Sequence, residues 1–270
     1  MRVLITGASR GIGLAISKAL LEKGHAVIGT SRAAASAPGT SGTIAPASFP
    51  MLQLNLSDSS SIAACVRQAG EIDVLINNAG ISQMGAVEEI PVEKIRELFQ
   101  TNFFGMIELT QAFLPQMRER RNGFIINIGS LAGKFAVPFR SSYVASKFAL
   151  AGFSWSLRNE VMPIGIKVTV IEPSEIHTTI VPELFTKVGS EYAERLGKVK
   201  NARASNMANA PGPEVVAKKV ADIIEEYSGN SKQPAPFYVV GKNARLMIAA
   251  KRFVPDGLIE KMVRKSYGLE

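Results

Sequence analysis

Tyr143 and Lys147 are the residues whose types and spacing first suggest chemistry. They stand four positions apart in the stretch YVASK, which places both side chains on one face of a helix, one turn from each other. A phenol loses its proton at roughly pH 10 in water, and a neighbouring ammonium favours the phenolate. The pair could therefore work as a general acid–base centre. The same spacing also occurs by chance on solvated helices, so the rest of the sequence has to support this hypothesis.

Two polar residues ahead of the pair are further candidates. An apolar, strand-like run at residues 124–128 ends in Gly129-Ser130, thirteen positions before Tyr143. Taken alone, a serine at a strand end is commonly a turn residue. Asn102 lies inside an expected helix at residues 92–117, where asparagine is unfavourable by propensity, although it could also be a tolerated polar residue.

The elements that position these residues begin with a glycine-rich turn. Residues 2–5 form a short apolar run, TGASRGIG follows, and apolar residues then repeat at helical spacing. Glycines allow a tight turn and a close approach of the backbone to a pyrophosphate at the positive end of the helix. The alternative is a glycine turn without a ligand, but the order strand, turn, helix favours a dinucleotide site.

The composition limits the alternatives. The chain has 270 residues, of which 46% are hydrophobic and 20% charged, as expected for one α/β domain. It has no apolar run of about 18 residues, and its N-terminus shows no pattern of a signal peptide, so we expect a cytoplasmic protein. The single cysteine, Cys65, gives neither a disulfide framework nor a zinc cluster, and we expect no metal.

The formal net charge of +8 is concentrated near the C-terminus, where residues 242–270 hold seven Lys or Arg against three Asp or Glu. A basic surface attracts anionic cofactors, membranes or nucleic acids. The sequence has no aromatic–basic interleaving of the kind that stacks bases and no nucleic-acid-binding motif, so nucleic acid is not an expected partner.

These motifs, in this order, resemble those of the short-chain dehydrogenase/reductase family. The glycine spacing matches its T-G-x-x-x-G-x-G signature, N-N-A-G at residues 77–80 matches its second signature, and YVASK carries its Y-x-x-x-K. The resemblance implies a doubly wound, mostly parallel sheet of the Rossmann type, with three α/β/α layers in a single domain over residues 1–270. It also implies a catalytic set of Asn102, Ser130, Tyr143 and Lys147. In the family, the residue at Ser130 donates a hydrogen bond to the substrate oxygen, as in an oxyanion hole, and the residue at Asn102 helps to hold a water that connects the lysine to solvent.

The resemblance also implies a cofactor site, and the residues after the second expected strand indicate NADP(H). Where NAD-binding units have an acidic residue, this chain has Ser31 and Arg32, and Arg10 lies in the glycine turn. No carboxylate is there to repel a 2′-phosphate, although both arginines could instead be solvated surface residues. The family pattern extends the predicted cofactor-binding set to Gly7, Ser9, Arg10, Gly11, Ile12, Gly13, Ser31, Arg32, Asn55, Leu56, Asn78, Ala79, Gly80, Tyr143, Lys147, Pro173 and Thr178.

Two of these positions depart from the family pattern. Asn55 stands where the family has an aspartate beside the adenine, and an amide can still exchange hydrogen bonds with that ring. Ser174 replaces a glycine between Pro173 and Thr178, and serine is less favourable than glycine at unusual φ. The residues between 33 and 50 are rich in small and turn-forming types and predict a surface loop.

The rest of the chain is expected to shape the substrate site. In the family, the segment corresponding to residues 179–211 closes over the substrate as a lid, and the helix at 92–117 packs between subunits of a homodimer or homotetramer. Apolar walls are expected from Leu131, Phe135, Val137, Ile180, Val181, Leu184 and Phe185. The tail at 242–270 carries two apolar–basic stretches, which predict helices that pack on their own domain or on a partner subunit, with peripheral membrane contact as the alternative.

We therefore expect an NADP(H)-dependent oxidoreductase that interconverts a ketone or aldehyde and an alcohol. By resemblance, the small-molecule substrate is apolar, of a steroid-, retinoid- or acyl-like kind. The alternative is a cofactor-binding regulatory or scaffolding protein on the same fold. Such proteins often lose the tyrosine or the lysine, whereas Tyr143 and Lys147 are both present here.

Overall fold

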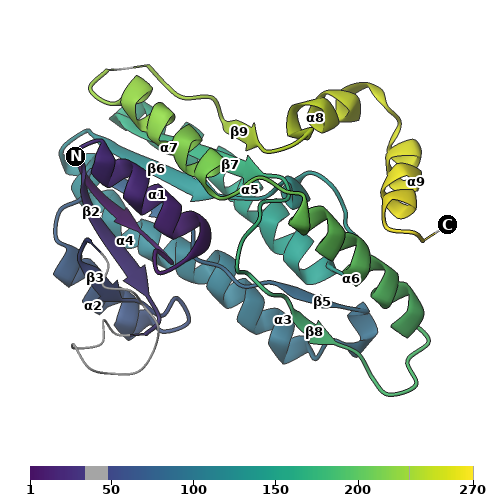
Figure 1. The fold of residues 1–270 in the computed structure, drawn as a ribbon. Coiled ribbons are helices and arrows are strands. Elements are labelled where there is room, and N and C mark those ends of the chain that lie inside the picture. The colour runs from purple at the N-terminus through teal and green to yellow at the C-terminus, as the bar shows by residue number, and fades with distance from the viewer. Residues whose placement is uncertain (34–47, 231, 270) are drawn as a thin grey trace.

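A parallel β-sheet organises the computed structural model, which describes residues 1–33, 48–230 and 232–269. Within these residues, seven strands form the sheet in the order β3-β2-β1-β4-β6-β7-β9, and all neighbours run parallel (Figure 1). The strands are β1 (Arg2–Ile5), β2 (Ala26–Ser31), β3 (Met51–Gln53), β4 (Val74–Asn77), β6 (Gly123–Ile128), β7 (Ile166–Pro173) and β9 (Phe237–Val240). Residues 34–47 of the predicted surface loop lie outside the described residues.

Helices cover both faces of the sheet. On one face α1 (Gly11–Glu22) packs beside α7 (Glu214–Tyr227), and their apolar side chains meet those of β1 and β4. On the other face lie α2 (Ser59–Ala69), α4 (Gly105–Glu119) and α5 (Ser141–Val161). Strands β4 and β6 are mainly apolar and buried along their whole length, as expected for a sheet covered on both faces. The predicted fold class, a doubly wound α/β sheet in one domain, is confirmed.

The helix expected at residues 92–117 is divided by a wider turn. The structure has α3 (Val92–Phe99), then a π-helical turn η2 (Gln100–Phe104), then α4. A π turn holds one more residue than an α turn and occurs often at functional sites. Asn102 lies in this turn, 3% exposed, and its side-chain amide bonds to the backbone of Ile81 instead of solvent.

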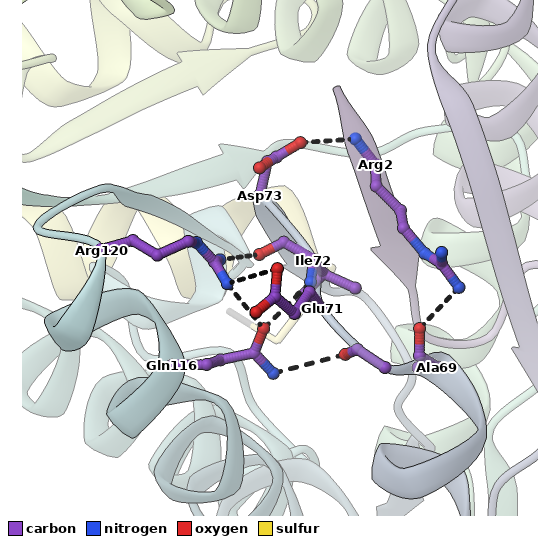
Figure 2. Close-up of polar contacts among 8 residues, drawn as sticks. Arg2, Ala69, Glu71, Ile72, Asp73, Gln116 and Arg120 are labelled. Atoms are coloured by element: carbon purple, nitrogen blue, oxygen red, sulfur yellow. Dashed lines mark hydrogen bonds and ion pairs between the residues drawn. The ribbon is translucent and has the colours of Figure 1, made fainter.

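A polar network ties together the amino ends of two strands (Figure 2). The Arg2 backbone N–H donates to Asp73 Oδ2 at 2.7 Å, and the Arg2 guanidinium donates to the Ala69 carbonyl at 2.7 Å. From α4, Gln116 Oε1 accepts from the Ile72 N–H at 3.1 Å, and Arg120 donates to the Ile72 carbonyl at 2.7 Å. The network joins β1, the end of α2, the entry to β4 and the end of α4.

The segment expected as a lid contains more regular structure than the sequence indicated. Strand β8 (Glu183–Phe185) pairs in parallel with β5 (Gln83–Gly85). The sequence indicates only a short helical piece near residues 191–198, whereas α6 covers Ala193–Ala208. Of the expected apolar walls in this segment, Ile180 lines the central cavity, whereas Val181 is 82% exposed. Short 3-10 turns connect the remaining elements: η1 (Val87–Glu89), η3 (Leu131–Gly133) and η4 (Met162–Ile164).

The tail forms α8 (Ala244–Phe253) and α9 (Asp256–Ser266), close to the two predicted apolar–basic stretches. Figure 1 shows α8 directly after β9 and α9 farther out, towards the C-terminus, both beyond the main body of the sheet. Tyr267 and Leu269 pack against Met84, Leu196 and Val199, so the end of the described chain contacts its own domain. Within the described residues, no helix is both long and apolar enough to cross a bilayer.

Gly105, the first residue of α4, packs against the loop that follows β3. A Cβ at Gly105 would lie 2.0 Å from the backbone oxygen of Leu56, whereas a Cβ at Gly152, within α5, meets nothing within 4 Å. Because overpacking costs about 1–3 kcal/mol, we expect Gly105→Ala to lower the free energy of unfolding by about 2 kcal/mol.

The matched variant Gly152→Ala should raise the free energy of unfolding by up to about 1 kcal/mol, because alanine is the better helix former. Urea denaturation of both variants measures the difference. Equal stability of the two variants would show that α4 is free to move away from Leu56.

Candidate active site

A cavity of about 1070 Å³ opens at the carboxyl ends of the strands. This is the edge at which doubly wound sheets bind ligands. The glycine-rich turn after β1 and the loops after β2, β3, β4, β6 and β7 form its walls, together with α6 and the tail. Of the predicted cofactor-binding and catalytic residues, those on the cavity wall are Gly7, Ser9, Arg10, Gly11, Ile12, Ser31, Arg32, Asn55, Leu56, Asn78, Ala79, Gly80, Ser130, Tyr143, Lys147, Pro173 and Thr178.

The glycine-rich turn has the conformation that its residue types require. Gly7 has φ of +68° and Gly11 of +57°, which glycine adopts without the steric cost that other residues incur. A Cβ at Gly13 would lie 2.4 Å from the Gly7 carbonyl oxygen, so this glycine serves close packing behind the turn. The Asn78 side chain donates to the Thr6 carbonyl at 2.8 Å. The turn after β1 is thereby held to the N-N-A-G segment after β4.

Arg10 and Arg32 are exposed cations at the same end of the cavity as the glycine turn. Ser31 is the last residue of β2, and its hydroxyl donates to the Ala33 carbonyl at 2.6 Å. Asn55 stabilises its own turn, because its Oδ1 accepts from the Ser57 N–H at 3.1 Å. This end of the cavity therefore combines backbone donors with exposed positive charge, an arrangement that suits phosphate groups.

Tyr143 and Lys147 lie on the first two turns of α5, where that helix faces the cavity. The Lys147 side chain is 6% exposed, and its Nζ donates to the Ile128 carbonyl at 3.0 Å. Its ammonium nitrogen is 5.8 Å from the centroid of the Tyr143 ring. Ser130, next to the end of β6, accepts from the Ala132 N–H at 3.1 Å, which fixes its side chain.

The charges around Tyr143 favour its phenolate. Burial alone would raise the pKa of the phenol, but the positive charges of Lys147 and Arg140, with hydrogen bonds from Ser130 and Arg140, outweigh it and lower the pKa from its ordinary value. The pKa of Lys147 is also lowered, mainly by burial, with Arg140 contributing and the charge of Tyr143 opposing. Neighbouring groups whose pKa values are both shifted by burial and by each other's charge are typical of acid–base sites.

Asn102 lies behind the cavity wall. Its Oδ1 accepts from the Ile81 N–H at 2.8 Å, and its Nδ2 donates to the Ile81 carbonyl at 3.0 Å and the Ser146 hydroxyl at 3.3 Å. The side chain therefore positions the loop after β4 against α5. Its predicted part in a water relay stays a prediction.

The loop after β7 accommodates serine at the family's glycine position. Within the described residues, the non-glycine residues with positive φ are Arg121, Phe139 and Asn243, so Ser174 needs no unusual backbone conformation. Its N–H donates to the Val240 carbonyl at 2.8 Å. The substitution therefore leaves Pro173 and Thr178 on the cavity wall.

Comparison with known proteins identifies the family. The family model described as short chain dehydrogenase matches residues 1–189. The chain is also 33% identical to a 3-ketodihydrosphingosine reductase of Bacteroides thetaiotaomicron, over 99% of this chain and 98% of that relative. This chain belongs to the short-chain dehydrogenase/reductase family. The predicted resemblance is confirmed.

Solved structures of this family share the fold. A short-chain dehydrogenase from Streptomyces avermitilis superposes with a TM-score of 0.76 at 31% identity, covering 100% of this chain and 98% of that one. The closed form of a serine dehydrogenase complexed with NADP⁺ superposes with a TM-score of 0.72 at 27% identity, covering 90% and 95% of the two chains. The family membership makes this chain an oxidoreductase that uses a nicotinamide dinucleotide.

The cavity of this family member has side chains that the sequence did not reveal. Arg140, three residues before Tyr143, places its guanidinium carbon 4.2 Å from the centroid of the tyrosine ring. Arg203 of α6, Glu175 of the loop after β7 and Tyr267 of the tail also line the cavity. The spacing of Arg140 from Tyr143 was the one signal available, because the others depend on tertiary structure.

We expect Arg140→Gln to raise the pKa of Tyr143, because the variant removes a cation that favours the phenolate. The titration of Tyr143 is followed by its ultraviolet absorbance. The absorbance of Arg140→Gln that also carries Tyr143→Phe is subtracted, so that only the signal of Tyr143 remains. Arg195→Gln, an exposed charge loss on α6, is the control and should leave the titration unchanged. An unaltered Tyr143 titration in Arg140→Gln would contradict the assignment.

Proposed function

We propose that the protein is an NADP(H)-dependent oxidoreductase that interconverts a ketone or aldehyde and an alcohol, with an apolar substrate. The observation that carries the proposal is the convergence of Ser130, Tyr143 and Lys147 on one cavity that also contains the glycine-rich turn. The lowered pKa of Tyr143 supports a role in proton transfer. A regulatory or scaffolding protein would have no need of this combination.

The residues of the cavity fit a nicotinamide dinucleotide phosphate. The first N–H groups of α1, which begins at Gly11, have no intrahelical partner and could face a pyrophosphate. A side chain at Gly7 would meet Ala79 at 3.1 Å. Arg10 and Arg32 would hold the 2′-phosphate, since neither stands beside an acidic residue in the sequence. The related serine dehydrogenase was solved with NADP⁺, which supports the same preference here.

The cofactor would supply the hydride for carbonyl reduction, and the chain's own residues would move the proton. The Tyr143 hydroxyl protonates the carbonyl oxygen as negative charge develops on it, and the Ser130 hydroxyl donates a hydrogen bond to that oxygen. Lys147 stabilises the resulting phenolate until a proton returns from solvent. In alcohol oxidation, the Tyr143 phenolate takes the proton from the alcohol.

Several features support an apolar substrate enclosed by the lid and the tail. Leu131, Phe135, Val137 and Ile180 line the cavity as predicted, and Met207, Met247 and Val263 join them from α6, α8 and α9. The relative from Bacteroides thetaiotaomicron is named as a 3-ketodihydrosphingosine reductase, which supports a lipid-like ketone as substrate here. A homodimer or homotetramer through the helices at 92–117 and 141–161 is part of the proposal, since Phe104 and Phe148 are 53% and 43% exposed there.

We expect Tyr143→Phe to lower turnover by about 10³-fold, in the range for loss of a general acid or base. NADPH binding, measured by fluorescence titration, should change little because the ring remains. Tyr238→Phe is the control, since its hydroxyl bonds to Tyr227 and Ala235. Near-normal carbonyl reduction by Tyr143→Phe would refute the mechanism.

We expect kcat/KM to be at least about tenfold higher with NADPH than with NADH, equivalent to about 1.4 kcal/mol. Arg32→Ala should remove most of this preference by lowering the NADPH value alone, because NADH has no 2′-phosphate. Arg67→Ala, an exposed charge loss on α2, should change neither value. Equal efficiency of the wild-type protein with both cofactors would disprove the preference.

A further inference from the structure

The cavity has more positive charge than the cofactor and the catalytic tyrosine require. Among the described residues that line it, the charged side chains are one carboxylate, Glu175, and six cations: Arg10, Arg32, Arg140, Lys147, Arg203 and Lys242. Arg10 and Arg32 lie at the end proposed for the cofactor phosphates, and Lys147 supports Tyr143. Arg140 helps to lower the pKa of Tyr143, whereas Arg203 has no part in the proposed function.

The Arg140 side chain is fixed by its contacts, yet not all of its N–H donors are used. It follows Phe139, whose φ of 59° is strained for a bulky residue. One guanidinium nitrogen donates to the buried Ser82 hydroxyl at 3.0 Å, and the group stacks over Tyr143. Its Nε is buried and has no hydrogen-bond partner among the described residues. A guanidinium fixed in this way is pre-organised to bind an acceptor group.

Arg203 approaches the same region from α6. Its pKa is lowered, first by burial and then by the positive charge of Arg140, so the two guanidinium groups repel each other. Glu175 offsets only part of this charge, and its carboxylate accepts from the Asn206 side chain at 3.1 Å. Within the described part of the chain, neither Arg140 nor Arg203 forms an ion pair. An anion between them would relieve the repulsion.

We propose that the substrate carries an anionic group, a carboxylate or a phosphate, which Arg140 and Arg203 bind close to the reacting carbonyl. Guanidinium groups bind both kinds of oxyanion through paired hydrogen bonds. Because Arg140 stacks on Tyr143, the anionic group lies within a few bonds of the carbon that accepts hydride. The apolar remainder of the substrate packs against Phe135, Val137 and Met207. This inference rests on the proposed function and narrows its substrate to an amphiphilic oxo acid or oxo phosphate.

The test compares medium-chain ketones that carry a carboxylate, a phosphate or a neutral methyl ester at the same distance from the carbonyl. NADPH consumption by the full chain gives kcat/KM for each. We expect the best anionic ketone to exceed the ester by at least about tenfold, or 1.4 kcal/mol. The ranking of the two anionic members identifies which oxyanion the site prefers.

Variants distinguish the loss of anion binding from a general loss of activity. Arg203→Gln should lower kcat/KM for the anionic ketones by about tenfold and leave the ester unchanged, and Arg203→Lys should recover part of the loss. Lys200→Gln removes an exposed charge from the same helix and should have no effect. An ester used as well as the acids, or an equal loss for ester and acids in Arg203→Gln, would overturn the subsite while leaving the proposed function intact.

A binding measurement distinguishes failure of the subsite from failure of the proposed function. Decanoate, decyl phosphate and methyl decanoate are titrated by calorimetry into the NADPH-loaded protein and into Arg203→Gln. Binding of the anions that is stronger than that of the ester, and weakened in Arg203→Gln, would support the subsite even if no ketone is reduced. Anions that bind no better than the ester would refute it, and absence of turnover with every carbonyl would refute the oxidoreductase proposal.

Discussion

The burial of one ammonium group constrains much of this structure. Lys147 has lost nearly all contact with water, and an unpaired charge is costly to bury. The Ile128 carbonyl at the end of β6 compensates in part by accepting a hydrogen bond from it at 3.0 Å. This bond requires α5 to lie directly against the carboxyl end of the sheet. Tyr143, one helical turn earlier, is thereby placed at the edge where the loops converge.

The two ends of the sheet have different tasks. At the amino ends, Arg2, Gln116 and Arg120 satisfy backbone groups between strands and helices. At the carboxyl ends, donors and cations are left facing a cavity. Cations gathered in one cavity repel one another and lower the stability of the protein. Their presence is understandable if bound ligands supply the compensating negative charge. The hydrogen bonds at the amino ends stabilise the sheet, and the sheet in turn positions the loops of the cavity at the carboxyl ends.

The sequence predicted the sheet well, because apolar strands bounded by glycine, asparagine and proline give clear local signals. It also identified the family from short motifs. Helix α6 was largely missed, since Leu196 and Val199 are its buried residues and too few to form a periodic apolar stripe. The π turn at Asn102 was missed because a single extra residue hardly alters a broadly apolar pattern. The convergence of Arg140 and Arg203 depends on how α6 crosses the cavity, which no local pattern encodes.

The π turn also has a consequence for how this helix tolerates insertions and deletions. Each residue rotates an α-helix by about 100°, so the additional residue between Gln100 and Phe104 sets the rotational phase of α4 relative to α3. In this phase Leu98 of α3 and Phe113 of α4 are both fully buried. A one-residue deletion that restored a regular helix would rotate α4 by about 100° relative to α3. Either Phe113 or Leu98 would then point away from the core. The length of this segment is therefore constrained by the burial of residues on both sides of the turn.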